Sequence, residues 1–284
     1  MGCVATTAGV QRWRLTRLVA WGCLILLPAE SASEETGIRS PSVLGEDSTA
    51  KLPTDSNTAL VPCPQGEGPW LEKFERQCRA ARGSDAAIVF LGDSITESWQ
   101  TVGSDVWAKH IVPLRALNLG IAGDRTQHVR WRLQHGALAD LQPSAVVLLI
   151  GTNNLKEQRN TAEETLAGVC AVVTDLLQTT PQSTQILLIG ILPCCESPDD
   201  PWRQSAAWIN RRLANHHWPS RVRWLDLSSV FLRPDESIRV ELMADYLHPT
   251  SAGYRDLAAV LLPHLHGALR PADVLEQGDF GNEQ

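Results

Sequence analysis

Five short, largely apolar runs, separated by longer segments with helical spacing, constrain the fold of this chain more than any other feature. The runs are 86–91, 116–119, 145–150, 185–191 and 222–227. The strongest of them, 145–150, holds no polar residue, which is typical of a strand buried on both faces. The helical patterns between the runs are 106–111, 126–134, 161–178, 204–215 and 251–266. This alternation predicts an α/β fold in which helices cover both faces of a parallel sheet.

The N-terminal residues have the order of an export signal. Three arginines precede an apolar run, 18–29, and small and polar residues follow at 31–33. The run is shorter than the ~20 residues that span a membrane, so we expect residues 1–33 to be a signal peptide. The protein would then be secreted, or lie in the periplasm or cell envelope. An uncleaved N-terminal anchor is the alternative, and Met1–Thr6 also fits the loose N-myristoylation pattern.

The rest of the chain divides by composition. Its 284 residues suffice for one sizeable core. Residues 34–68 are rich in Ser, Thr, Glu, Asp and Pro without periodicity and predict a disordered linker. We expect a single domain over residues 69–270 and a polar tail over residues 271–284.

Charge and cysteine content narrow the function further. The formal net charge is −7 and no basic stripe occurs, so we expect no nucleic-acid partner. Cys63 and Cys78 could pair in an oxidising compartment, or all the cysteines after the signal could be free. The adjacent pairs Cys194-Cys195 and His216-His217 lack the spacing of a metal site, and we expect neither metal nor cofactor.

Polar, reactive residues collect where the predicted strands end, and a further group precedes the last predicted helix. Each group alone has a structural interpretation: Ser94 with Glu97 fits a helix capping box, and Gly123 fits a turn. In a parallel sheet, however, ligands bind beyond the carboxyl ends of the strands. The groups are Gly92–Ser94, Gly123–Asp124, Gly151–Asn154 and Asp245–His248.

Taken together, these residues supply the parts of an ester hydrolase. A serine hydroxyl such as that of Ser94 is a poor nucleophile without a base, and His248 can take its proton near neutral pH. Asp245, three residues away, can orient that histidine. The backbone N–H groups of Ser94 and Gly123 and the side-chain amide of Asn153 could stabilise the oxyanion of the tetrahedral intermediate.

The constellation resembles the SGNH, or GDSL-type, hydrolase superfamily, which is named after Ser, Gly, Asn and His in four successive blocks. Ser94, Gly123, Asn153 and His248 occur in that order. The segment Ala116–Leu133, with Gly151–Asn154 and Asp245–His248, looks very like the platelet-activating-factor acetylhydrolase IB catalytic subunits. The resemblance covers about residues 70 to 268.

The resemblance implies a three-layer α/β/α, flavodoxin-like fold with a five-stranded parallel sheet. It also implies metal-free hydrolysis by a triad of Ser94, His248 and Asp245, with Ser94, Gly123 and Asn153 forming the oxyanion hole. Ile95, Thr152 and Leu247 stand at the positions that line the acyl pocket. Their bulk suits a short acyl group, acetyl foremost, on a small ester substrate such as an acetylated sugar or lipid.

The sequence departs from the acetylhydrolase subunits in two respects. Ala122 stands where those subunits usually have a second glycine. The expected export signal contrasts with their cytosolic location, so their regulatory partner is not assumed, whereas a homodimer is expected from the resemblance.

Two other functions remain open. A thioesterase or longer-chain lipase of the same superfamily would share the chemistry and differ in the pocket. A catalytically idle carbohydrate-binding relative would keep the fold. That relative would use tryptophans for recognition, such as Trp99, Trp107 and Trp131.

Overall fold

The computed structural model describes residues 57–271 and residue 273. The expected signal peptide, residues 34–56 of the expected linker and nearly all of the expected tail lie outside these described residues.

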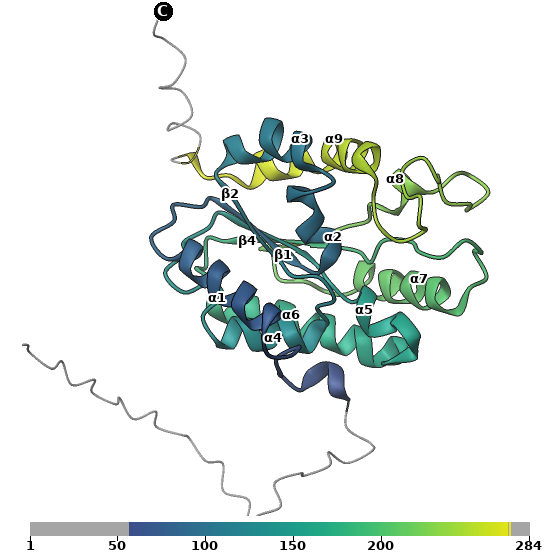
Figure 1. Cartoon of the computed structure of the whole chain (residues 1–284), viewed down its shortest axis with the longest axis horizontal. Coiled ribbons are helices and arrows are strands. Elements are labelled where there is room, and N and C mark those ends of the chain that lie inside the picture. Colours follow the sequence, from purple (N-terminus) through teal and green to yellow (C-terminus); the bar gives the residue numbers. More distant parts are fainter. Residues whose placement is uncertain (1–56, 272, 274–284) are drawn as a thin grey trace, which may run out of the picture. The chain divides into compact units, whose positions relative to one another are not determined.

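A five-stranded sheet forms the middle layer of the molecule (Figure 1). The strand order is β2-β1-β3-β4-β5 and every recorded pairing is parallel, as the alternation of runs and helices predicts. In the register, Ile88 lies beside Ala116 on one side and Ala145 on the other. The strands are β1 (Ile88–Gly92), β2 (Ala116–Gly120), β3 (Ala145–Leu149), β4 (Gln185–Ile189) and β5 (Val222–Leu225).

Helices precede, connect and follow the strands. The longer ones are α1 (Pro69–Ala81), α4 (Thr126–Gln134), α6 (Ala162–Thr179), α7 (Pro201–Ala214) and α9 (Ser251–Ala268). The short α-helices are α2 (Ser94–Glu97), α3 (Ser104–Val106), α5 (Thr152–Leu155) and α8 (Ser228–Phe231). The 3-10 helices are η1 (Thr58–Leu60), η2 (Ser98–Gln100), η4 (Val112–Leu114) and η5 (Lys156–Gln158), and η3 (Trp107–Ile111) is a π-helix.

Alternate residues of each strand enter two separate cores. Ile88 and Phe90 of β1 pack with the face covered by α9 and the short helices after β1. Val89 and Leu91 pack with the opposite face, which α4, α6 and α7 cover. Every residue of β1 is buried, which explains its nearly uninterrupted apolar sequence. The arrangement is a three-layer α/β/α fold, in agreement with the expectation.

Local sequence signals fix the ends of the helices. At the start of α6, the Thr161 hydroxyl accepts from the Glu164 N–H at 3.1 Å, and the Glu164 carboxylate accepts from the Thr161 N–H at 2.9 Å. The predicted helix over 106–111 is confirmed as helical, although α3 ends at Val106 and a wider π-helix follows over Trp107–Ile111.

The linker predicted over residues 34–68 extended too far along the chain. Residues 57–60 pack against the domain, where Ala59 is fully buried and its carbonyl accepts from the Thr126 hydroxyl at 2.9 Å. Asn57 caps η1 through its side chain. The sequence does not predict that this segment packs on the domain, because its composition is polar and a single buried alanine produces no hydrophobic periodicity.

The predicted tail also begins too early at residue 271. Asp273 is 3% exposed and pairs with Arg115 and Arg270. Its carboxylate also accepts from the Ser144 hydroxyl. These contacts place residue 273 in the domain.

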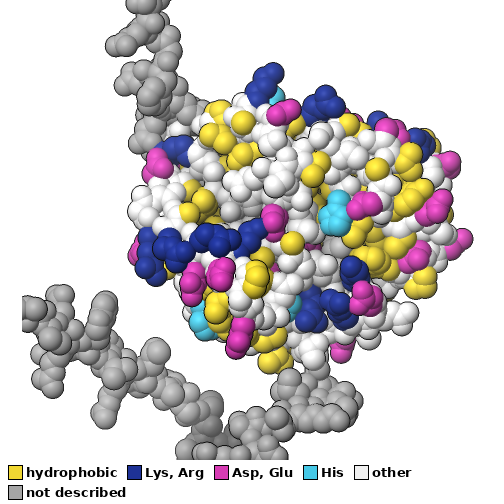
Figure 2. All heavy atoms as spheres, viewed as in Figure 1, with side chains coloured by type: hydrophobic (Ala, Val, Ile, Leu, Met, Phe, Trp, Pro, Cys, Tyr) yellow, Lys and Arg dark blue, Asp and Glu magenta, His cyan; other side chains and the backbone are white. Residues whose placement is uncertain are grey.

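The described surface carries mixed charge. In Figure 2 a row of Lys and Arg side chains lies over α1, with Asp and Glu side chains beside it. In the part of the chain that the structure describes, no helix is both long and apolar enough to cross a membrane. Over the same residues, no cluster of three or more potential metal ligands occurs.

Candidate active site

The strand order brings the predicted site residues to one edge of the sheet. Because β1 lies between β2 and β3, the segments that follow these three strands are neighbours. Ser94 follows β1, Gly123 follows β2 and Asn153 follows β3. Each of the three residues is partly accessible. The strand order also reverses here, the position at which sheets of this kind bind ligands.

A chain of hydrogen bonds joins Ser94 to the loop before α9. The Ser94 Oγ lies 3.0 Å from the Nε2 of His248, which is 154 residues away in sequence. The other ring nitrogen, Nδ1, lies 2.7 Å from the Oδ2 of Asp245. The structure thus connects the serine, histidine and carboxylate that the sequence singles out, in the order that nucleophile activation requires.

Asp245 is held by its own loop. Its Oδ1 accepts from the backbone N–H groups of Leu247 at 3.0 Å and His248 at 2.7 Å. Partial burial opposes the charge, but these hydrogen bonds and that of the His248 ring outweigh it and lower the pKa of Asp245. The carboxylate is therefore ionised at neutral pH and can orient the ring.

The loop itself is anchored to a neighbouring segment. Tyr246 has a positive φ of 56°, and its carbonyl accepts from the Cys195 N–H at 2.8 Å. This bond ties the Asp245–His248 turn to the segment that follows β4.

Asp93, not Ser94, caps the short helix α2. The Asp93 Oδ1 accepts from the Ile95 N–H at 3.0 Å. Glu97, the proposed partner of Ser94 in a capping box, accepts from the Ala122 N–H at 2.6 Å and pairs with Lys73 at 2.5 Å. Ser94 is thereby left free to face His248.

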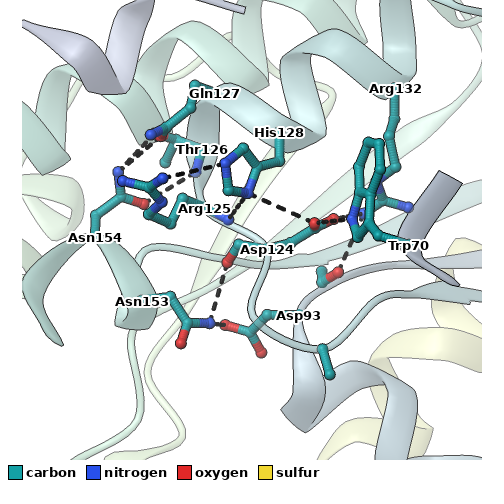
Figure 3. A network of polar contacts seen from close by, with 12 residues as sticks. Trp70, Asp93, Asp124, Arg125, Thr126, Gln127, His128, Arg132, Asn153 and Asn154 are labelled. Carbon is teal, nitrogen blue, oxygen red and sulfur yellow. Dashed lines mark hydrogen bonds and ion pairs between the residues drawn. The ribbon is translucent and has the colours of Figure 1, made fainter. Parts of the chain in front are cut away.

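The three groups expected to donate to the oxyanion differ in whether they already donate a hydrogen bond within the protein. Within residues 57–271, the N–H groups of Ser94 and Gly123 donate to no recorded acceptor. The Asn153 amide already donates to the Asp93 Oδ2 at 3.2 Å and to the Asp124 carbonyl at 3.1 Å (Figure 3). The structure therefore supplies two unengaged backbone donors and one amide held beside them.

The backbone of Gly123 has a conformation that favours glycine. Its φ is 78°, where side chains are strained. A Cβ atom there would also lie 2.4 Å from the Nε2 of Gln65, which belongs to the segment expected to be a linker. The N-terminal segment therefore reaches the edge of the site.

The expected acyl-pocket residues differ in exposure. Ile95 is 1% exposed and Thr152 is 3% exposed, whereas Leu247 is partly exposed beside His248. The Thr152 Oγ1 is buried and has no hydrogen-bond partner among the described residues. Two of the three tryptophans considered for sugar recognition, Trp99 and Trp107, are core residues, so they offer no surface for a ligand.

Sequence reasoning missed the buried polar network behind the site (Figure 3). Arg132 is fully buried and its guanidinium donates to the Leu119 carbonyl at 2.6 Å and the Gly92 carbonyl at 3.2 Å, which joins the ends of β2 and β1. It also pairs with Asp124 at 2.7 Å, and Asp124 accepts from the Trp70 indole at 2.8 Å. The spacing of Asp124, His128 and Arg132, four residues apart in turn, was the available signal.

Burial shifts the pKa of three groups in this network. It raises the pKa of Asp93 to about 7, an effect that the nearby Asp124 increases. It raises the pKa of Asp124 to about 6 in spite of Arg132. It lowers the pKa of His128 to about 3, with Arg125 adding to the effect. His128 is therefore neutral, and its 3.7 Å approach to Asp124 is no ion pair, because its Nδ1 accepts from the Arg125 N–H at 3.1 Å.

The other sequence predictions have simpler outcomes. Cys63 and Cys78 are not joined, and Cys170, Cys194 and Cys195 are also free thiols. Ala122 is exposed and its N–H is held by Glu97, so the alanine fits beside Gly123.

Comparisons with known proteins identify the relatives of this chain. Residues 90–255 match the GDSL-like Lipase/Acylhydrolase family. The chain is 35% identical over 218 residues to the human platelet-activating factor acetylhydrolase IB subunit alpha2, covering 73% of this chain and 90% of that protein. It is 33% identical over 235 residues to the bovine alpha1 subunit, covering 80% of this chain and 95% of that protein.

Solved structures share the fold. A GDSL-like lipase from Bacteroides thetaiotaomicron has a TM-score of 0.56 at 18% identity, covering 69% of this chain and 98% of that one. The acetylxylan esterase Axe2 from Geobacillus stearothermophilus has a TM-score of 0.51 at 20% identity, covering 66% and 99%.

The fold and the sequence relatives define the class of the protein as a carboxylic ester hydrolase. Within that class, the chain belongs to the GDSL-like lipase/acylhydrolase family.

Proposed function

We propose that this protein is a serine esterase that removes short acyl groups, acetyl foremost, with Ser94 as the nucleophile. One observation carries the proposal: the continuous hydrogen-bonded path from the Ser94 Oγ through His248 to the Asp245 carboxylate, at 3.0 and 2.7 Å. A serine activated by a neighbouring base and an oriented histidine is the arrangement that acyl transfer needs.

In the proposed acylation step, the Ser94 Oγ attacks the ester carbonyl while the His248 Nε2 takes its proton. The N–H groups of Ser94 and Gly123 stabilise the oxyanion, and Asn153 joins them by turning one N–H away from Asp93. Collapse of the intermediate breaks the bond to the alcohol, which leaves with the proton from His248. An acyl-Ser94 ester remains.

In the proposed deacylation step, His248 takes a proton from water, and the resulting hydroxide equivalent attacks the acyl carbon. The bond to the Ser94 Oγ then breaks, the serine recovers its proton from His248, and the carboxylic acid departs. Asp245 stays ionised throughout and stabilises the positively charged ring.

The preference for a short acyl group has two supports. Ile95, Thr152 and Leu247 bring bulk to the expected acyl side of the serine. The relatives include proteins named as acetylhydrolases and acetylxylan esterases. We propose an acetylated sugar or lipid as the substrate, in an exported protein that dimerises. The export rests on the sequence of residues 1–33 and the dimer on the resemblance alone.

The test is a rate profile over p-nitrophenyl acetate, butyrate and octanoate, with and without a serine-directed phosphonate. We expect a phosphonate-sensitive acetate rate that falls as the acyl chain lengthens. Ser94→Ala should lose at least about a thousandfold in kcat and keep its circular dichroism spectrum. Full activity in that variant would refute the nucleophile assignment. A higher rate on octanoate than on acetate would favour a longer-chain lipase.

A further inference from the structure

Asp124 connects the network behind the site to Asn153, one of the residues expected to stabilise the oxyanion (Figure 3). The backbone carbonyl of Asp124 accepts from the Asn153 amide at 3.1 Å. Its side chain accepts from the Trp70 indole at 2.8 Å and pairs with the Arg132 guanidinium at 2.7 Å. Because this residue is 0% exposed, its side chain does not reach a substrate, and any effect of Asp124 on the reaction passes through its backbone.

The bond to the Asp124 carbonyl is the anchor that Asn153 keeps during the proposed reaction. The amide nitrogen has two N–H groups and two acceptors, the Asp93 carboxylate at 3.2 Å and the Asp124 carbonyl at 3.1 Å. When one N–H turns away from Asp93 toward the oxyanion, the Asp124 carbonyl is the recorded acceptor that still holds the amide. The position of this carbonyl therefore sets the direction of the N–H that faces the oxyanion.

The side chain of Asp124 fixes a short connection between a turn and α4. The Asp124 N–H donates to the Ile121 carbonyl at 3.2 Å, which closes the turn around Gly123. Helix α4 begins two residues after Asp124. The side chain ties this connection to α1, which carries Trp70, and to α4, which carries Arg132. The Asp124 carbonyl is thus held by side-chain bonds to two helices.

Of the two side-chain partners, Trp70 has the simpler role. Arg132 also donates to two carbonyls at the strand ends, so its loss would disturb the sheet as well. The Trp70 indole N–H has Asp124 as its one recorded acceptor among the described residues. The indole is 8% exposed, and its ring packs with centroids 6.1 Å from Phe74 and 5.5 Å from Trp131. Packing therefore holds the ring in place and directs its N–H at Asp124.

We propose that Trp70 is a positioning residue for the ester hydrolysis: its indole N–H fixes Asp124, whose carbonyl aims the Asn153 amide at the oxyanion. This role rests on the proposed function, in which Asn153 stabilises the oxyanion. Trp70 touches no reacting atom and acts through Asp124. Helix α1 then contributes to the esterase site, although it precedes the family match of residues 90–255.

Trp70→Phe removes the indole N–H and keeps an aromatic ring. We expect kcat on p-nitrophenyl acetate to fall by about tenfold and KM to change by less than about twofold, because the oxyanion forms only after the substrate has bound. Rates are expressed per active site, counted with the serine-directed phosphonate, so that unfolded protein does not contribute. Trp131→Phe is the matched control and should keep kcat, since it makes the same change in the same aromatic cluster without a recorded hydrogen bond to Asp124 among the described residues.

Trp70→His separates the hydrogen bond from the packing of the ring. This variant keeps a ring N–H but removes more of the aromatic surface than Trp70→Phe does. We expect it to keep kcat within about threefold of the unaltered protein, a result that also decides the matter if Trp70→Phe does not fold. A larger loss in Trp70→His than in Trp70→Phe would assign the effect to packing and reject the positioning role.

Asn153→Ala tests the end of the path. If Trp70 acts through Asn153, Trp70→Phe should lower kcat by less than about threefold once the Asn153 amide is absent. A full tenfold loss in the Asn153→Ala background, or an unchanged kcat in Trp70→Phe alone, would overturn the positioning role and leave the proposed function intact. An unaltered protein that hydrolyses no ester and does not react with the phosphonate would instead refute the proposed function, and the role of Trp70 with it.

Discussion

Burial of the His128 ring ties the stability of the fold to pH. Its pKa falls from an ordinary 6.5 to about 3, so the unfolded chain binds this proton more readily than the folded one. The stabilising contribution is complete above about pH 6.5 and is lost as the pH falls toward 3. His128→Gln, which keeps an acceptor for the Arg125 N–H, should remove that dependence.

Urea denaturation of His128→Gln and the unaltered protein at pH 7 and pH 4 measures this effect. We expect the unaltered protein to lose on the order of 2 kcal/mol more than the variant between these pH values. Asp93 and Asp124 act in the opposite direction, since their raised pKa values give stability at low pH that is lost as the pH rises through about 7 and about 6. Both carboxyls are present in both proteins, so the comparison cancels them. Equal losses in the two proteins would contradict the assignment.

At the residue scale, the sequence predicted which polar side chains the structure brings together better than it predicted the side chains that support them. Ser94, His248 and Asp245 stand in short motifs, so their chemistry can be inferred from residue type and spacing. The Trp70 indole donates a hydrogen bond to Asp124, which is 54 residues away in sequence, and no local sequence pattern predicts such a contact. The engagement of Asn153 by Asp93 likewise depends on the close approach of two strand ends.

At the scale of elements, Glu97 joins three segments around the site. It lies in α2, pairs with Lys73 of α1, and accepts from the Ala122 N–H beside Gly123. Loss of this acceptor should let the turn after β2 move, which displaces the Gly123 N–H from the proposed oxyanion. We therefore expect Glu97→Ala to lower kcat on p-nitrophenyl acetate by about tenfold, with little change in KM.

Two matched variants separate this positioning role from the ion pair. Glu97→Gln keeps an acceptor for Ala122 and should restore most of the rate. Lys73→Met removes only the partner of a pair whose side chains are 28% and 30% exposed, so it should have little effect. A Lys73→Met defect as large as that of Glu97→Ala would assign the effect to the ion pair instead.

The elements themselves were predicted unevenly, for physical reasons. The strands were found because burial on both faces demands apolar runs, and 145–150 differs from β3 by a single residue. Helix α1 was not predicted, although Pro69 at its first turn and buried Trp70 and Phe74 mark it. Its charged residues, Lys73 and Arg76 among them, dominate the segment and mask the narrow apolar stripe.

At the scale of the whole molecule, the contacts of residues 57–68 determine where the folded unit begins. The Asn160 amide donates to the Thr58 hydroxyl at 2.9 Å, and the Thr126 hydroxyl donates to the Ala59 carbonyl at 2.9 Å. The Arg130 guanidinium donates to the Leu60 carbonyl at 2.5 Å. These bonds connect the segment to α4 and to the start of α6, so the segment contributes to stability although its composition resembles that of a linker.

Two truncated chains test this boundary. A chain that starts at Asn57 should keep the melting temperature and esterase rate of the full chain, because it retains every described contact. A chain that starts at Pro69 loses the burial of Ala59 and the hydrogen bonds of the segment, together about 3 kcal/mol. For a domain of this size we expect its melting temperature to fall by on the order of 10 °C. Removal of Gln65 from beside Gly123 should also alter kcat. Equal melting temperatures for the two chains would show that residues 57–68 contribute nothing to stability. The folded unit would then begin at residue 69, as the composition predicts.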